Sequence, residues 1–173
     1  NTNRLIYFTD EINQLTKLEE GKLPLKQLLI PIKPYLTTII NMFVSSASFK
    51  SIQLITNIEC NNGACMKIDP FQFEKVIFNL LSNALKHTQA GDEVKINVTP
   101  LDSNIIRINI IDTGIGIPAK DLPFLFDRYY QVVNNTNHIY EGLGIGLSLA
   151  KEIVSAHEGE LTVRSEEHIG TTF

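Results

Sequence analysis

Residues 70–111 read PFQFEKVIFNLLSNALKHTQAGDEVKINVTPLDSNIIRINII, and the spacing of the apolar side chains changes along this stretch. Over residues 70–87 they recur every three or four positions, which predicts an amphipathic helix. Over residues 93–100 and 104–111 they alternate, which predicts two strands joined by a short turn. A helix followed by two such strands favours an α+β fold with adjacent antiparallel strands.

The helix predicted over residues 70–87 has two faces. The stripe expected to be buried consists of Phe73, Ile77, Leu80, Leu81 and Ala84. A second face carries Asn79, Asn83, Lys86 and His87. Asparagine is a poor residue for the middle of a helix, because its side chain competes for backbone hydrogen bonds. Carboxamide oxygens suit Mg²⁺ and a lysine suits a phosphate, so this face is either a binding site or a solvated polar surface.

The rest of the chain continues the alternation of helices and strands. Further helices are predicted at residues 34–50, 118–128 and 146–157, and further strands at residues 51–59, 160–165 and from Gly170 onward. Together the elements predict a two-layer α/β sandwich, in which a mixed, mostly antiparallel sheet has helices on one face.

The start of the chain has a different pattern. Its apolar residues fall at the 3-4-3 spacing of a coiled-coil or bundle helix: Leu5, Phe8, Ile12 and Leu15. We expect this helix to begin before residue 1. The predicted organisation is the end of a helix at residues 1–20, a linker at residues 21–33, and the domain proper at residues 34–173, cut short at its last strand.

Composition limits the class of function. The 173 residues are 43% apolar and 20% charged, which is typical of a globular domain with its own core. Fifteen Lys and Arg residues against nineteen Asp and Glu residues give a net charge of −4 without clustered cations, which argues against nucleic-acid binding. No apolar stretch approaches the length of about 18 residues that a membrane span needs, so a cytoplasmic domain is expected.

The two cysteines, Cys60 and Cys65, flank residues 61–64. An Asn-Gly turn there would place them opposite each other across a hairpin. Without a nearby histidine they cannot complete a zinc site, and a reduced pair is expected because disulfides are rare in the cytosol.

Two segments of the chain are rich in glycine, and the first directly follows a predicted strand. In residues 112–118, DTGIGIP, glycines allow close approach of the backbone, and Asp112 can accept a hydrogen bond from an exocyclic amine. Residues 142–147, GLGIGL, open a helix, and the N–H groups of such a turn form a cradle for an anion. Neither segment is a Rossmann or Walker motif. The polar segment at residues 129–141 reads as a mobile lid.

The order of these motifs is specific. They are Asn79 and Asn83, DTGIG at residues 112–116, FDRYY at residues 126–130, GLGIG at residues 142–146, and GTTF at residues 170–173. This series resembles the N, G1, F, G2 and G3 boxes of the catalytic ATP-binding domain of bacterial sensor histidine kinases, in the GHKL superfamily. The F box is similar to that of hybrid kinases. The resemblance covers about residues 34–173 and implies that residues 1–20 end the second helix of a dimerisation and phosphoacceptor domain.

The resemblance implies ATP and Mg²⁺ as ligands. Asn83 would coordinate Mg²⁺ between the phosphates, with Asn79 supporting the metal. Lys86 would face the phosphates, and His87 would lie beside the nucleotide. Asp112 would accept the adenine amino group.

The other boxes receive roles in the same way. Gly114 and Gly116 would shape the base pocket, with Thr171 beside the Asp112 loop. The segment that would close over the phosphates comprises Gly142, Leu143, Gly144, Ile145, Gly146 and Leu147. Phe126 and Tyr129 would seat the lid. Arg128 would join Asn79 and Lys86 as a catalytic residue, by meeting the γ-phosphate charge.

Two departures from the family matter. Leu143 stands where the family often has Thr or Ser, so a side-chain hydrogen bond would be lost there. The four histidines, His87, His138, His157 and His168, lack the following acidic residue and downstream proline of a phosphoacceptor. The acceptor histidine is therefore expected in an upstream domain.

Hydrolytic members of the superfamily typically carry a glutamate four residues before the Mg²⁺-binding asparagine, where this chain has Asn79. We therefore expect a histidine kinase that passes the γ-phosphoryl group to a homodimeric upstream domain, and then to a response regulator receiver domain. The alternatives are an ATPase clamp, a serine-phosphorylating anti-sigma kinase and a non-catalytic module. The expected location is the cytoplasmic part of an inner-membrane-anchored receptor, with the membrane reached only through other segments.

Overall fold

The computed structural model describes residues 25–61, 63–102, 104–132 and 144–173. Its elements in chain order are β1 (Leu28–Pro31), α2 (Ile32–Phe49), β2 (Gln53–Ile58), β3 (Cys65–Ile68), α3 (Pro70–His87), β4 (Glu93–Pro100), β5 (Ile106–Asp112), the 3₁₀ turn η1 (Leu122–Phe124), α4 (Gly146–Ala156), β6 (Arg164–Glu166) and β7 (Gly170–Thr172). The helix expected at residues 1–20 lies outside the described residues.

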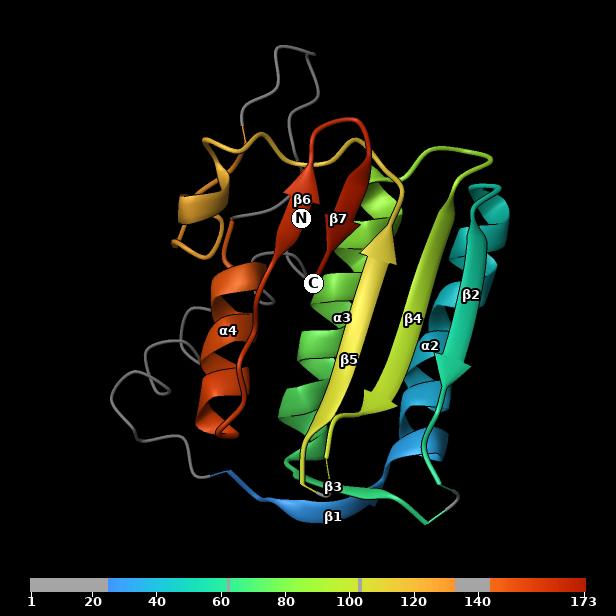
Figure 1. Cartoon of the computed structure of the whole chain (residues 1–173), viewed down its shortest axis with the longest axis vertical. Helices are drawn as coiled ribbons and strands as arrows, with labels where there is room; N and C mark the ends of the chain where they lie inside the picture. The colour runs from blue at the N-terminus through green and yellow to red at the C-terminus, as the bar shows by residue number, and fades with distance from the viewer. Residues whose placement is uncertain (1–24, 62, 103, 133–143) are drawn as a thin grey trace, which may run out of the picture.

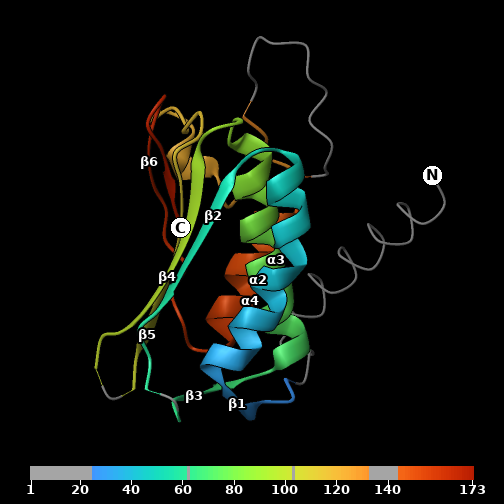
Figure 2. The same cartoon turned by 90° about the vertical axis from the view of Figure 1, so that its right-hand side faces the viewer.

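The molecule has two layers, as the sequence predicts. Five strands form a sheet in the order β2-β4-β5-β7-β6, in which β2 is parallel to β4 and the other pairs are antiparallel. Helices α2, α3 and α4 cover one face of this sheet (Figures 1 and 2). The core lies between the layers, where Val94, Ile96 and Val98 of β4 are buried with residues of the helices.

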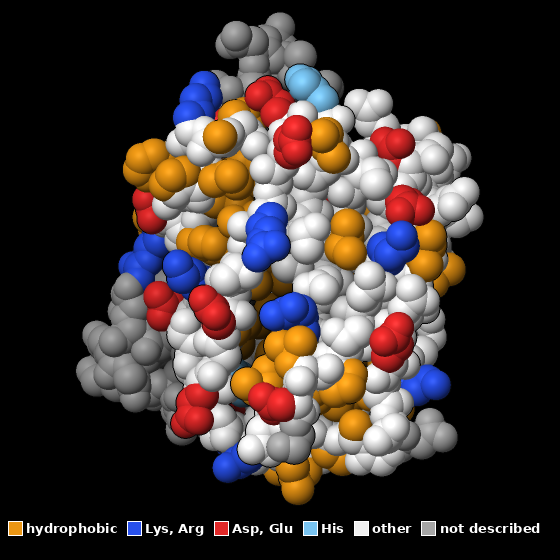
Figure 3. Space-filling view, in the orientation of Figure 1, with side chains coloured by type: hydrophobic (Ala, Val, Ile, Leu, Met, Phe, Trp, Pro, Cys, Tyr) orange, Lys and Arg blue, Asp and Glu red, His pale blue; other side chains and the backbone are white. Residues whose placement is uncertain are grey.

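The other face of the sheet is seen in Figure 3. Positive and negative side chains are interspersed over the described part of this face, so neither sign forms a continuous patch there. Among the described residues, no helix combines the length and the apolar character needed to cross a membrane.

Helix α3 has the bounds that its periodicity predicts. The side chain of Asp69 caps its start by accepting hydrogen bonds from the backbone N–H groups of the first turn. At its end the Thr88 hydroxyl donates to Ala84 O at 2.7 Å, and Lys50 Nζ donates to Leu85 O at 2.9 Å. The predicted stripe is buried except for Phe73, which is half-buried. Both ends of the helix are therefore held by side chains.

A helix predicted over residues 118–128 is wrong. The structure has only the 3₁₀ turn Leu122–Phe124 in this segment. Pro123 lies in the middle of the segment, and proline removes a helical hydrogen bond and disfavours the helical conformation of the residue before it.

Two strand predictions also need correction. The strand expected at residues 160–165 is the shorter β6 at Arg164–Glu166, because it forms only where β7 is available as a partner. The cysteines do not face each other across a hairpin, since β2 pairs with β4 and β3 pairs with β1. A turn does occur between them, where Ala64 N donates to Asn61 O at 2.9 Å, and both cysteines are free thiols.

The predicted linker at residues 21–33 includes β1 and the first residues of α2. Strand β1 pairs with β3 in a separate two-stranded sheet, from Leu28 opposite Ile68 to Pro31 opposite Cys65. Part of the linker therefore lies on the domain.

Candidate functional site

The candidate site begins where α3 meets the first turn of α4. Asn79 and Asn83 lie one turn apart on α3, and both side chains are half-buried. A Cβ atom placed on Gly146 would lie 3.0 Å from Oδ1 of Asn79. The glycine thus lets the start of α4 approach the Asn79 carboxamide closely.

The end of α3 meets the segment that follows β5. Ile115 N donates to His87 O at 3.2 Å. A Cβ atom on Gly114 would collide with the same carbonyl oxygen. The absence of a side chain at Gly114 is therefore what lets this loop pack against the helix.

His87 is a neutral side chain at physiological pH. Burial, with a smaller contribution from the charges of Lys86 and Lys50, lowers the pKa of His87 to about 4. A neutral imidazole presents a flat surface suited to contact with a ring, and the two lysines supply positive charge near it.

Asp112, the last residue of β5, is a buried carboxylate with 6% of its surface exposed. Its Oδ1 accepts a hydrogen bond from Gly114 N at 3.0 Å. Burial raises the pKa of this carboxyl group, and the backbones of Gly114 and Thr171 oppose the rise. A carboxylate has about four lone-pair sites, so acceptor capacity remains for a ligand.

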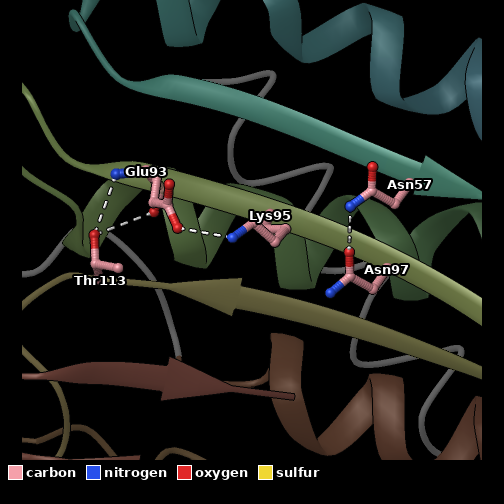
Figure 4. A network of polar contacts seen from close by, with 5 residues as sticks. All are labelled: Asn57, Glu93, Lys95, Asn97 and Thr113. Carbon is pink, nitrogen blue, oxygen red and sulfur yellow. Dashed lines mark hydrogen bonds and ion pairs between the residues drawn. The ribbon is translucent and has the colours of Figure 1, made fainter.

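Thr113 anchors this loop to β4, as Figure 4 shows. Its N–H donates to Glu93 O at 3.2 Å, and its Oγ1 accepts from Glu93 N at 3.1 Å. Lys95 Nζ lies 3.0 Å from Oε1 of Glu93. Farther along the sheet, Asn57 Nδ2 donates to Asn97 Oδ1 at 3.1 Å. The position of Asp112 is thus set by the strand beside it.

Sequence analysis missed Ser165 as a support of the loop. Its Oγ accepts from Ile117 N at 2.8 Å, donates to Gly170 O at 2.8 Å, and lies 2.9 Å from Oγ1 of Thr171. Ser165 lies opposite Thr171 in the β6–β7 register, and Thr171 lies opposite Asp112 in the β5–β7 register. No local sequence signal marks this serine, because its partners depend on strand register.

The segment after η1 is joined to the glycine-rich turn. Tyr129 N donates to Gly144 O at 3.0 Å, and both residues have positive φ angles, 63° and 69°. The ring of Phe126 lies edge-on to Phe173 at 6.4 Å, and Lys151 Nζ lies 4.7 Å from its centroid. Phe126 therefore packs beside α4 and the end of β7.

The remaining predicted residues divide into two groups. Lys86 and Arg128 are exposed, Ile145 is buried, and Leu147 is half-buried. Gly142, Leu143 and most of the predicted lid at residues 129–141 lie outside the described residues.

These residues form an arrangement that fits a nucleotide with Mg²⁺. Asp112 offers a buried acceptor for an exocyclic amine, and Gly114 lies beside it, where a side chain would collide with α3. Asn79 and Asn83 offer the hard oxygen ligands that Mg²⁺ prefers. Gly146 brings the backbone close to Asn79, at the start of a helix where an anion is favoured, and Gly144 lies against the backbone of Tyr129 and Tyr130.

Comparison with known families identifies the group to which this chain belongs. Residues 68–173 match the model of the histidine kinase-, DNA gyrase B- and HSP90-like ATPases. The chain is a member of that family. The match begins one residue before the α3 cap Asp69 and runs through β7, so it includes every described part of the candidate site.

Similar proteins include a sensor protein and a sensor histidine kinase. The chain is 30% identical over 173 residues to the sensor protein RprX of Bacteroides fragilis, covering 99% of this chain and 33% of RprX. It is 31% identical to the sensor histidine kinase WalK of Bacillus subtilis, covering 99% of this chain and 28% of WalK. The chain therefore spans a third or less of these two relatives.

The fold is that of solved histidine kinase structures. Full-length ShkA in complex with AMPPNP matches 98% of this chain and 35% of its own length, with a TM-score of 0.83 at 20% identity. This likeness confirms the predicted α+β sandwich.

Proposed function

We propose that this chain binds ATP with Mg²⁺ and donates the γ-phosphoryl group to a histidine of an upstream helical domain. The phosphoryl group then passes to an aspartate of a response regulator receiver domain. The observation that carries the proposal is the placement of Asn79, a carboxamide, against the first turn of α4 at Gly146. At this place a hydrolytic enzyme needs a carboxylate to activate water.

The residues of the site have separate tasks in this proposal. Asp112 accepts the amino group of adenine and so selects it over guanine, which presents an acceptor at that position. Neutral His87 lies beside the nucleotide. Gly114 and Gly116 shape the base pocket, because without side chains they let the loop pack against the backbone of His87 and Glu166. Thr171 supports the Asp112 loop through Ser165.

The phosphates belong to the other half of the site. Asn83 and Asn79 hold Mg²⁺, which when bound neutralises charge on the phosphate oxygens. The backbone of the glycine-rich turn cradles the phosphates, and Lys86 and Arg128 supply positive charge. The residues therefore bind and orient ATP, while the nucleophile comes from outside this domain.

The carboxylate of α3 that could activate water is Glu74, and it lies elsewhere on the helix. The negative charge of Glu74 contributes to raising the pKa of the Tyr35 hydroxyl group on α2. The Tyr35 hydroxyl donates to Pro70 O at 2.7 Å. Glu74 is therefore on the side of α3 that faces α2, and the phosphoryl acceptor that fits the site is a strongly nucleophilic imidazole.

The whole protein in this proposal is larger than the chain. It is a homodimer held by the upstream phosphoacceptor domain, with a cytoplasmic kinase region and a membrane anchor in other segments. The similarity to the sensor protein RprX and to the sensor histidine kinase WalK supports this context.

A labelling assay with γ-³²P-ATP tests the proposal. We expect the chain alone to bind ATP but to show neither appreciable hydrolysis nor self-labelling. Acid-labile, alkali-stable label should appear when the upstream helical domain is present and should disappear when its histidine is replaced. Asn79→Glu should raise hydrolysis, since general-base catalysis contributes about 10²–10⁴-fold where the geometry allows. Rapid hydrolysis by the unmodified chain alone would instead favour the ATPase clamp.

A further inference from the structure

Each end of α4 contacts α3 or its N-cap residue, and the contact at the C-terminal end lies outside the candidate site. At the start of α4, Gly146 faces Asn79 in the middle of α3. Near the other end His157, the residue after α4, meets Asp69, the residue before α3. A helix rises about 1.5 Å per residue, so the two contacts are about 15 Å apart along α3. In Figure 1 the start of α3 and the end of α4 lie beside β1.

Both ring nitrogens of His157 have assigned partners. Asp69 N donates to Nε2 at 2.9 Å, so Nε2 carries no proton. Nδ1 therefore carries the proton and donates to Ile153 O at 2.7 Å. The ring of Phe73 lies edge-on at 5.9 Å. The imidazole is thus held in one tautomer between α4 and the start of α3.

Asp69 connects this contact to the segment that enters the domain. Its buried Oδ1 accepts from Phe71 N and Gln72 N, both at 3.1 Å. Its Oδ2 accepts from Lys26 N at 2.9 Å. Lys26 is 43 residues before Asp69, and His157 is 88 residues after it. Asp69 is therefore the point where the entering segment, α3 and α4 meet.

We infer that His157 is a positioning residue for phosphoryl transfer, because through Asp69 it fixes the start of the segment at residues 25–31, whose strand β1 pairs with β3 of the domain. The inference rests on the proposed function. Transfer to a histidine of another domain needs the reacting atoms about 3–3.5 Å apart, and a misplacement of about 1 Å costs 10²-fold in rate. In the chain, residues 25–31 join residues 1–24 to the domain. The attachment of this segment therefore sets where the acceptor histidine meets the bound ATP.

Nucleotide binding does not need this attachment. Asn79 and Asp112 lie toward the other end of α3, where His87 O binds Ile115 N and Tyr129 N binds Gly144 O. These contacts are independent of Asp69. Loss of the His157 contact is therefore expected to slow phosphoryl transfer while leaving ATP binding nearly unchanged.

Hydrogen exchange of the Lys26 amide measures the attachment in this chain. His157→Ala removes the acceptor for Asp69 N. Asp69→Asn keeps an oxygen for the helix cap but turns an amide NH₂ group toward Lys26 N. We expect both variants to exchange the Lys26 amide at least tenfold faster. His157→Gln, which keeps an oxygen acceptor, should stay closer to the unmodified chain, and Ser155→Ala on the exposed side of α4 is the matched control.

The consequence for transfer is measured in the protein that carries the acceptor domain. We expect histidine labelling to slow at least tenfold in His157→Ala and Asp69→Asn, while the Kd for MgATP changes less than twofold. Unchanged exchange at Lys26 in both variants would overturn the inference. So would unchanged labelling despite faster exchange, or a loss of ATP affinity equal to the loss of labelling. If the unmodified protein labels no histidine, the proposed function fails, and the exchange rates still decide whether His157 holds the entering segment.

Discussion

Asp112 shows how a single residue combines burial with a free acceptor. Asp112 is 6% exposed, and its Oδ1 accepts a hydrogen bond from Gly114 N. Burial raises the pKa of this carboxyl group, and hydrogen bonds from the backbones of Gly114 and Thr171 oppose the rise. A buried acceptor beside a glycine is suited to one amino group of a planar base.

Replacement of Asp112 therefore tests base recognition. Asp112→Ala should weaken ATP binding by roughly 1–3 kcal/mol, because the adenine amino group would lose its buried partner. Calorimetric titration with ATP and GTP measures the effect, and the preference for ATP should shrink. Glu59→Ala, which removes an exposed carboxylate, is the control and should bind ATP normally. Equal ATP affinity in Asp112→Ala and the control would remove Asp112 from the site.

His87 gives the fold a dependence on pH. Its pKa is about 4 in the folded chain and 6.5 when unfolded, so the unfolded state binds a proton first as the pH falls. The neutral His87 side chain makes its full contribution to the free energy of unfolding above pH 6.5, and this contribution is lost as the pH falls toward 4. At about 1.4 kcal/mol per pKa unit, the loss is at most about 3.5 kcal/mol.

Urea unfolding at pH 7 and pH 4.5 measures this contribution. His87→Gln cannot titrate in this range, so its free energy of unfolding should fall less between the two pH values than that of the unmodified chain. Carboxyl groups titrate in both proteins, and the difference between them isolates His87. Equal falls would show that His87 is not buried as a neutral side chain.

At the scale of elements, the short strand β7 can approach β5 closely because residue 170 is a glycine. Gly170 has a φ of 140°, and a Cβ atom there would collide with the carbonyl oxygen of Asp112. Its own carbonyl accepts from Ser165 Oγ. The close approach of β7 to β5 places Thr171 opposite Asp112.

Gly170→Ala should consequently destabilise the domain and the site together. Strained backbone of this kind costs about 1–3 kcal/mol, and the collision adds to it. Gly63→Ala is the matched control, because a Cβ atom on Gly63 meets nothing within 4 Å, and it should change stability by less than about 0.5 kcal/mol. Thermal unfolding of the two variants measures the difference, and equal stability would contradict the close approach of β7.

At the scale of the whole molecule, the candidate site belongs to no single element. Asn79 comes from α3, Asp112 from the end of β5, Gly144 and Gly146 from the start of α4, and Thr171 from β7. The contacts between them are those of Asn79 with Gly146, His87 with Ile115, and Asp112 with Thr171. The sandwich therefore builds the site at one end of its helical layer, and leaves the contact of His157 with Asp69 at the other.

Some of this molecule follows from the sequence alone. The bounds of α3 and β4 agree with the periodicity of residues 70–87 and 93–100, because burial of one face imposes its period on neighbouring residues. The glycines near residues 114, 144 and 170 also stand out without a structure, since close approach and positive φ select glycine locally. The roles assigned to these residues remain proposals.

Other features were decided by tertiary structure. Ser165, Lys50 and His157 carry no local signal, because each finds its partner across a large separation in the chain. Strand β6 forms only where β7 runs beside it, and β1 only where β3 does, since a strand needs a partner for its backbone N–H and C=O groups. Local sequence sets which conformation a segment prefers, whereas register and helix packing set which distant side chains meet.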